Sequence, residues 1–431
     1  MTEENKNDAK VNADEHGEGQ VIGRLVPADN IHPDKTPGGN KASAKLNQAF
    51  EQAFYDTLER KGEGLLTKYL YHDPSKDDGL KDKKKVSDML DKHFGQFLYG
   101  ARAWDANTQR NKFYGLVSGD MEALDYAIEH HIVTKLPENM HLIDYGSGGE
   151  TGAHKSAKLI QAIRQDNTHD ISGYTAIDIV PRFASESATT IYNEFNLHAD
   201  MVICDFMGAE KVLVPKIKNK ENYTPLSLIF GGTLANAPDA SPGGGNDSKQ
   251  NAITCLSRMN KQHGTGSEVL LVFHSENDPK MLSQEYQSTD ELSAFVLSSF
   301  SRAVMQGTIT DSGYDPFRYW SIEPRYDANT KALKMCAVAR EDHTIPTAKG
   351  QVSIKKDEAF TSALSYKWDE NDYSLMLKQA GYEIIEIFRK EGAPRGAILA
   401  RALPSPELPA PLAAVTPLPV TPLPVAVPDA P

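Results

Sequence analysis

The stretch H-L-I-D-Y-G-S-G-G-E-T at residues 141–151 decides the fold of this chain. A short apolar run ends in Asp144, a glycine turn follows at once, and a helical pattern begins near His154. This order of strand, tight turn and helix start is typical of a nucleotide-binding loop, because backbone N–H groups approach a ligand closely and the helix N-terminus favours negative charge. Glycines alone do not identify the ligand, since the chain contains 31 of them and ordinary turns also need glycine.

Further apolar segments place polar side chains at strand ends. G-Y-T-A-I-D-I-V carries Asp178, where a carboxylate binds ribose hydroxyls in dinucleotide folds. M-V-I-C-D-F ends in Asp205 and Phe206, a polar and stacking pair suited to adenine. L-S-L-I-F-G-G-T runs toward Asn236, and E-V-L-L-V-F-H ends at His274. Because parallel strands present their carboxyl ends at one sheet edge, the sequence predicts a doubly wound α/β sheet with a cofactor site there.

Composition limits the possible classes of protein. The 431 residues are 39% hydrophobic and 24% charged, as in a globular protein, and the net charge of −13 disfavours nucleic-acid binding. The three cysteines lack metal-ligand spacing, so no metal site is expected. No apolar run approaches the ~20 residues of a membrane span, and the first ten residues are too polar for a signal peptide. We therefore expect a cytoplasmic monomer that binds neither membranes nor nucleic acid.

Periodicity and composition divide the chain into parts. Helical patterns cover 42–70, 119–133, 252–262 and 289–305, and the two last apolar segments predict an antiparallel hairpin at a sheet edge. In chain order, we expect a disordered N-terminal segment (1–41), a helical part of a substrate-binding lobe (42–131), the cofactor-binding domain (132–280), an insertion belonging to the substrate lobe (281–338), strands that close the cofactor-binding domain (339–401) and a disordered Pro-rich segment (402–431).

The sequence resembles the S-adenosylmethionine-dependent histidine Nα-methyltransferases of ergothioneine biosynthesis, together with fungal relatives that N-methylate a prenylated tryptophan. The F-G-G-T-L-A-N block is the most specific, because general methyltransferases lack it. The resemblance covers roughly residues 100–401 and implies a Rossmann-like class I methyltransferase sheet with a second α+β substrate-binding lobe. The matching blocks are D-Y-G-S-G (144–148), A-I-D (176–178), C-D-F (204–206), F-G-G-T-L-A-N (230–236), the segment around Glu285 and Tyr286, A-L-K-M-C-A-V (332–338) and L-S-Y-K-W (364–368).

The resemblance also implies where S-adenosylmethionine binds. The glycine loop would line the methionine part, Asp178 would take the ribose hydroxyls, and the C-D-F block would hold the adenine. Lys155 matches a family lysine near the cofactor. The implied cofactor residues are Gly146, Ser147, Gly148, Lys155, Asp178, Asp205 and Phe206.

For the acceptor, the resemblance implies that Asn236 grips an α-amino acid. Tyr286 matches a family tyrosine beyond the fifth strand, and Tyr114 matches an aromatic residue of the N-terminal lobe. These three residues imply a small-molecule amine as substrate.

The sequence departs from the family in the residues that recognise the acceptor side chain. The histidine enzymes use a glutamate and a serine two residues later, where this chain is expected to place Lys334 and Cys336. His274 replaces a family aspartate after the fifth strand. These departures argue against histidine itself as the acceptor and leave the methyl donor unchanged.

The chemistry assigns catalytic roles to three residues. An amine must lose its proton before it attacks a methyl group, and an α-amino group titrates near pH ~8, so a weak base suffices. Asn236 would hold the nitrogen, and Tyr286 would orient it or relay the proton through water. His274 is a candidate base, and it is equally consistent with a hydrogen-bonded histidine at a strand end.

The leading hypothesis is an N-methyltransferase acting on the α-amino group of an amino acid or its derivative. A nicotinamide-dependent oxidoreductase is disfavoured by the C-D-F block, the F-G-G-T-x-x-N block and the final hairpin. A non-catalytic S-adenosylmethionine-binding protein stays open, as does a methyltransferase whose protein substrate is recruited through the terminal segments.

Overall fold

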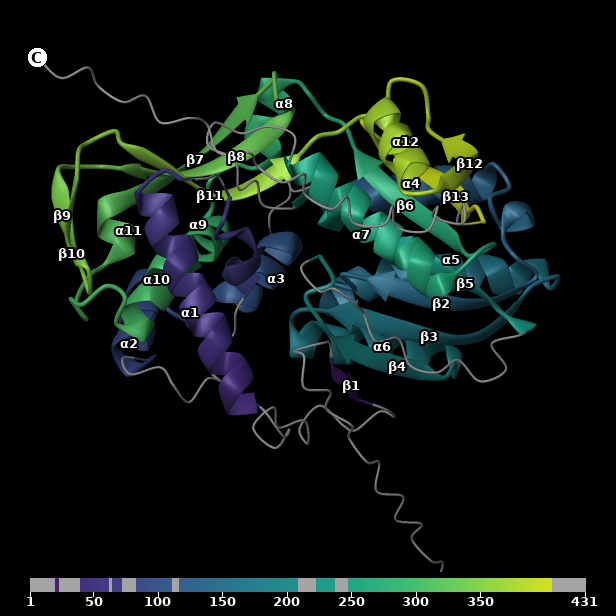
Figure 1. Cartoon of the computed structure of the whole chain (residues 1–431), viewed down its shortest axis with the longest axis horizontal. Coiled ribbons are helices and arrows are strands. Elements are labelled where there is room, and N and C mark those ends of the chain that lie inside the picture. The colour runs from purple at the N-terminus through teal and green to yellow at the C-terminus, as the bar shows by residue number, and fades with distance from the viewer. Residues whose placement is uncertain are drawn as a thin grey trace, which may run out of the picture.

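The computed structural model describes residues 20–22, 39–61, 64–71, 83–110, 116–207, 222–236 and 247–404. Figure 1 shows two lobes side by side, one around a large sheet and the other around a smaller sheet with α1 and α10. Within the described residues, none of the helices combines the length and apolar character needed to cross a membrane.

The large sheet confirms the predicted doubly wound architecture. Its order is β1-β4-β3-β2-β5-β6-β13-β12, and β2 to β6 run parallel. The predicted terminal hairpin is also present, because β13 pairs antiparallel with both β6 and β12. The strands are β1 (Gln20–Ile22), β2 (Asn139–Tyr145), β3 (Asp170–Asp178), β4 (Ala199–Ile203), β5 (Thr224–Ile229), β6 (Glu268–His274), β12 (Tyr382–Phe388) and β13 (Arg395–Ala402).

Helices cover both faces of this sheet, so β2 is buried from Met140 onward. Leu142 packs with α4, α5 and α6 on one face, and Ile143 packs with α7 and α12 on the other. Short 3₁₀ helices, η5 (Val133–Lys135) and η7 (Thr233–Asn236), connect strands and helices. The covering helices are α4 (Leu116–Glu129), α5 (Gly149–Asp166), α6 (Pro181–Phe195), α7 (Asp247–His263) and α12 (Glu370–Gln379).

The second lobe combines a three-stranded antiparallel sheet, ordered β11-β8-β7, with a two-stranded ribbon and several helices. Its elements are α1 (Gly39–Leu58), η3 (Thr67–Tyr71), α2 (Lys83–Phe94), α3 (Gly100–Arg110), α8 (Pro279–Glu285), α9 (Asp290–Val296), α10 (Ser298–Gln306), α11 (Pro316–Tyr319), β7 (Trp320–Asp327), β8 (Ala332–Ala339), β9 (His343–Thr347), β10 (Gly350–Ile354) and β11 (Ala359–Tyr366).

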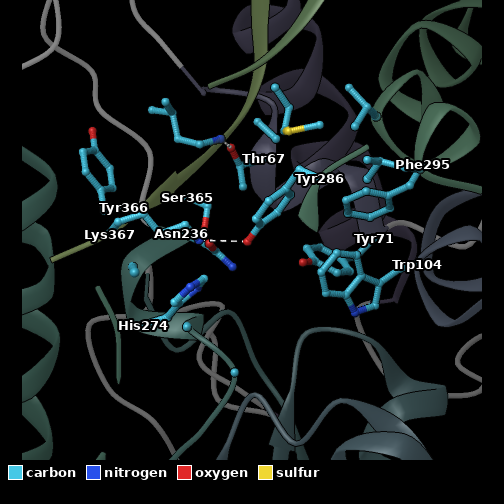
Figure 2. A pocket seen from close by; sticks show the side chains of 18 of the residues that line it. Thr67, Tyr71, Trp104, Asn236, His274, Tyr286, Phe295, Ser365, Tyr366 and Lys367 are labelled. Carbon is cyan, nitrogen blue, oxygen red and sulfur yellow. Dashed lines mark hydrogen bonds between the residues drawn. The ribbon is translucent and has the colours of Figure 1, made fainter. Parts of the chain in front are cut away.

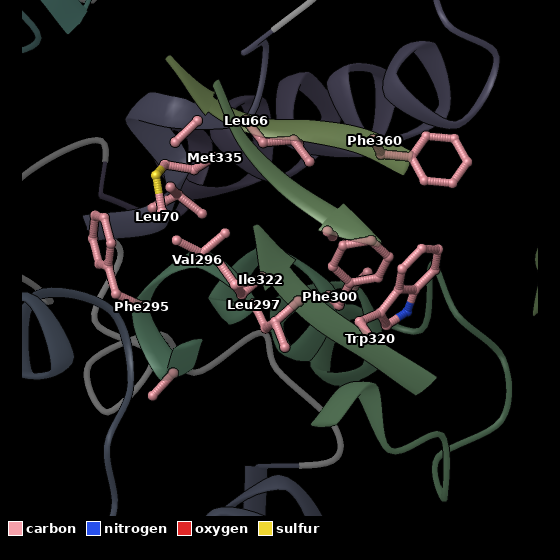
Figure 3. Close-up of a cluster of buried hydrophobic side chains, with 14 of the residues drawn as sticks. Leu66, Leu70, Phe295, Val296, Leu297, Phe300, Trp320, Ile322, Met335 and Phe360 are labelled. Atoms are coloured by element: carbon pink, nitrogen blue, oxygen red, sulfur yellow. The ribbon is translucent and has the colours of Figure 1, made fainter. Parts of the chain in front are cut away.

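An aromatic core joins distant segments of the second lobe (Figure 3). The rings of Phe300 and Trp320 lie 5.1 Å apart, and Phe54 contacts Phe300 edge-on at 5.5 Å. These three side chains are buried and come from α10, β7 and α1. Segments that precede and follow strands β2 to β6 in the sequence therefore fold into one core.

The structure corrects several predicted elements. The helix expected over 42–70 ends at Leu58, before Gly64 adopts a left-handed φ of 64°, and the helix over 289–305 is broken at Leu297. Three residues of the segment expected to be disordered form β1.

Two segments also belong to a different lobe than the sequence indicated. Helix α4, which lies within the expected substrate-lobe part 42–131, packs on the large sheet. Strand β11, expected among the closing strands of 339–401, pairs with β8 in the second lobe. The periodicity of each element shows which of its residues share a face, but not which element that face meets.

Candidate active site

The glycine loop between β2 and α5 has a backbone conformation and a tight packing that favour glycine. The Gly146 N–H donates to the Ile177 carbonyl (2.8 Å), and Gly148 and Gly149 adopt left-handed φ values of 68° and 73°. A Cβ at Gly152 would lie only 1.9 Å from the Ser147 carbonyl oxygen. Glycine is therefore favoured at Gly148 and Gly149 by backbone conformation and is required at Gly152 by the close approach of the Ser147 carbonyl.

Asp178 ties the end of β3 to this loop. Its Oδ2 accepts the Gly148 N–H (3.0 Å) and its Oδ1 accepts the Val180 N–H (2.9 Å). Burial raises the pKa of Asp178 to about 6, although these two hydrogen bonds oppose the shift. The carboxylate is held in one orientation beside the loop.

A cavity of about 310 Å³ lies over the glycine loop, between the two lobes. The second lobe contributes Thr67, Tyr71 and Trp104 to its wall. Ser147 does not line it; the side chain is buried, and its Oγ has no hydrogen-bond partner among the described residues. The predicted cofactor residues that do line the cavity are Gly146, Gly148, Lys155, Asp178, Asp205 and Phe206.

A smaller cavity of about 50 Å³ adjoins the first (Figure 2). Asn236 lines both cavities, whereas His274 and Tyr286 line only the smaller one. The structure therefore brings together the three predicted catalytic residues from η7, β6 and the end of α8.

Two predicted substrate residues line neither cavity. Met335 faces the smaller cavity, and because side chains alternate along a strand, its neighbours Lys334 and Cys336 point away from it. The Lys334 Nζ lies 3.4 Å from an oxygen of Asp327. The assignment of Lys334 and Cys336 to acceptor recognition is therefore wrong in this geometry. Tyr114 lies outside the described residues.

The segment after β8 supplies side chains that sequence reasoning missed. Ser365 and Lys367, two residues apart along β11 and just beyond it, line the smaller cavity. The Lys367 Nζ donates to the Tyr286 hydroxyl (2.8 Å) and to Ser365 Oγ (3.1 Å). Burial lowers the pKa of Lys367 to about 7. The alternation in L-S-Y-K-W was the available signal, but the sequence does not show which face meets a cavity.

A buried ion network runs from the cofactor cavity to the smaller one. Lys155 Nζ lies 3.1 Å from Asp120, and Arg395 contacts both Asp120 (2.9 Å) and Glu285 (2.6 Å). His274 Nε2 lies 3.5 Å from Glu285. All five residues are at least nine-tenths buried, so the charges of Lys155, Arg395 and the two carboxylates depend on one another.

Removing Arg395 is expected to be strongly destabilising. In Arg395→Met, Glu285 and Asp120 lose a buried cation, so the free energy of unfolding should fall by about 3–5 kcal/mol, measured by urea denaturation. Gly119→Ala should act in the same direction, because its Cβ would lie 2.3 Å from Arg395 Nε. As a control, Arg325→Met breaks an exposed pair with Glu323 and should cost no more than about 1 kcal/mol. Equal losses in Arg395→Met and Arg325→Met would contradict the network's structural role.

A parallel sheet closed by an antiparallel hairpin, with a cavity over its glycine loop, defines a Rossmann-like protein with a site for a nucleotide-like cofactor. The model of the family described as histidine-specific, S-adenosylmethionine-dependent methyltransferases matches residues 51–402, and the chain belongs to that family. The cofactor is therefore S-adenosylmethionine. No curated protein sequence matches the chain significantly.

Solved structures also resemble the chain at low identity. An S-adenosylmethionine-dependent methyltransferase from Clostridium acetobutylicum is 10% identical, with a TM-score of 0.35 over 70% of this chain and 97% of that one. The CcbJ methyltransferase from Streptomyces caelestis is 9% identical, with a TM-score of 0.32 over 65% of this chain and 95% of that one.

Proposed function

We propose that this enzyme transfers a methyl group from S-adenosylmethionine to the α-amino nitrogen of an amino acid or an amino-acid-derived small molecule. The observation that carries the proposal is the position of Asn236, which lines both the cofactor cavity and the smaller cavity. An amide there can hold an amine next to the methyl group.

The residues of the larger cavity fit the cofactor. Gly146 and Gly148 would lie along its methionine part, Asp178 would accept its ribose hydroxyls, and Asp205 with Phe206 would hold the adenine. Ser147 belongs to the same loop, and its buried Oγ has no hydrogen-bond partner among the described residues. Lys155 lines this cavity and pairs with Asp120, so its positive charge would lie beside the bound cofactor.

The smaller cavity fits an amino acid with its side chain against an apolar wall. Phe295, Val296 and Met335 form part of that wall, and the described lining contains no carboxylate to pair with an imidazolium. On the polar side, the buried Nδ1 of His274 has no hydrogen-bond partner among the described residues and would bind the acceptor. Amino acids with apolar side chains are therefore tested beside histidine.

The chain's own residues position the reaction. When bound, S-adenosylmethionine supplies a methyl group activated by a sulfonium sulfur. Asn236 would accept a hydrogen bond from the acceptor nitrogen and direct its lone pair toward the larger cavity, and Tyr71 and Trp104 would exclude water where the cavities meet. Such positioning accounts for most of the rate in an in-line displacement.

Methyl transfer from isotopically labelled S-adenosylmethionine tests the proposal. Acceptors are histidine, tryptophan, the other amino acids, a metabolite extract and a protein extract, assayed in parallel. We expect label in a small molecule, and fragmentation by mass spectrometry should place the methyl on the α-nitrogen. Label confined to protein, or to another atom of the acceptor, would contradict the proposal. Tight cofactor binding without transfer would instead favour a non-catalytic protein.

A further inference from the structure

We propose that Lys367 accepts the proton that the acceptor's ammonium group must lose before methyl transfer, through the hydroxyl of Tyr286. This inference rests on the proposed function and adds a proton acceptor that the sequence analysis did not identify.

The geometry places this pair in the acceptor cavity. The Lys367 Nζ and the Tyr286 hydroxyl are 2.8 Å apart, and both residues line the cavity with Asn236. Figure 2 shows Asn236, Lys367 and the Tyr286 hydroxyl converging from different elements on one region. An amine held by Asn236 would therefore lie beside a hydroxyl already connected to a buried lysine.

Burial favours a neutral Lys367, and it outweighs the nearby carboxylates. Two buried carboxylates, Asp120 and Glu285, are already matched by two buried cations, Lys155 and Arg395. A protonated Lys367 would be an additional buried cation. Burial, the largest cause, and Arg395 oppose the charge, whereas Glu285 and Asp120 favour it. The titratable and charged groups that face it are Glu285 and Tyr286 at α8, Arg395 on β13, Asp120 on α4, His274 on β6 and Glu276 just after β6.

His274 is the weaker base for this step. Burial is the largest cause that lowers the pKa of His274 well below its usual value of 6.5, and Arg395 acts in the same direction. Lys367, with a pKa of about 7, is closer to the α-amino group's pKa of ~8, so proton transfer to it is less unfavourable. His274 then keeps the role of a neutral hydrogen-bonding group.

The proton and electron balance is complete. The ammonium N–H bond breaks as the Tyr286 oxygen takes its proton and the Tyr286 hydroxyl proton moves to the Lys367 lone pair. The freed nitrogen lone pair forms the N–C bond to the methyl group, and the C–S bond breaks with its electrons left on sulfur. Lys367 ends as an ammonium and is reset by loss of its proton to solvent after product release.

The test compares the full chain with Lys367→Met, Lys367→Arg, Lys367→Ala and Lys334→Met. Histidine and tryptophan are the probe acceptors, and kcat and KM are recorded against pH. Lys334→Met is the matched control, since Lys334 lies on the adjacent strand and lines neither cavity. We expect kcat of Lys367→Met at pH 7 to fall about 100- to 10,000-fold and to recover above pH ~8, where the acceptor amine loses its proton in solution. Lys334→Met should behave as the wild type.

Lys367→Arg and added methylamine show whether Lys367 acts as a base or as a group that binds the acceptor. Arginine keeps a positive charge but cannot accept a proton, so a base predicts no rescue by arginine and partial rescue of Lys367→Ala by methylamine. Rescue by arginine, or a change confined to KM, would show that Lys367 binds the acceptor's carboxylate and would overturn the inference. An active wild type with an unaffected Lys367→Met would overturn it too. A wild type inactive with every acceptor would instead reject the proposed function itself.

Discussion

Asn236→Ala is expected to lower kcat/KM at least about 100-fold while changing the affinity for S-adenosylhomocysteine less than about threefold. The large effect follows from its position, because Asn236 is the proposed contact to the reacting nitrogen where the two cavities meet. Cofactor affinity should change little, since the larger cavity keeps the glycine loop, Asp178 and Phe206. Labelled methyl transfer and calorimetric titration with S-adenosylhomocysteine measure the two quantities separately.

Asn251→Ala is the matched comparison for Asn236→Ala. Asn251 lines the larger cavity but not the smaller one, so its substitution should affect cofactor affinity more than it affects kcat. A parallel loss of activity and cofactor affinity in Asn236→Ala would place Asn236 in the cofactor site and contradict its role toward the amine.

Asp178→Asn is expected to weaken cofactor binding about 10- to 100-fold, because charge-assisted hydrogen bonds to two ribose hydroxyls contribute about 1.5–3 kcal/mol in total beyond neutral ones. The wild-type affinity should also depend on pH. Burial raises the pKa of Asp178 to about 6, so the free protein takes up a proton as the pH falls through 6 and loses the carboxylate that binds the hydroxyls. Affinity should be constant above about pH 7 and fall by up to tenfold per pH unit below about pH 6.

Asp170→Asn provides the control for Asp178→Asn. Asp170 begins the same strand, β3, at its opposite end, and hydrogen-bonds Tyr223 at the surface. Its variant should keep the wild-type affinity and pH profile, whereas Asp178→Asn should bind weakly and independently of pH between 5 and 7. A pH-dependent Asp178→Asn would assign the titration to another group.

The sequence by itself determined the large sheet and the cofactor side of the site. Apolar strand segments that end at or just before Asp178 and Asp205 are local patterns, and parallel strands bring their carboxyl ends to one edge of the sheet. The glycine loop is equally local, because glycine adopts its left-handed backbone most readily and leaves room for the close approach at Gly152.

The tertiary structure decided the acceptor side. Lys334 and Ser365 lie on neighbouring strands with similar patterns. Only the packing of the second lobe against the sheet makes Ser365 and Lys367 line a cavity, while Lys334 does not line it. The pKa of Lys367 likewise depends on burial beside Arg395 and Glu285, which come from distant segments. Side-chain alternation along a strand fixes which residues share a face, but contacts between distant parts of the chain fix what that face meets.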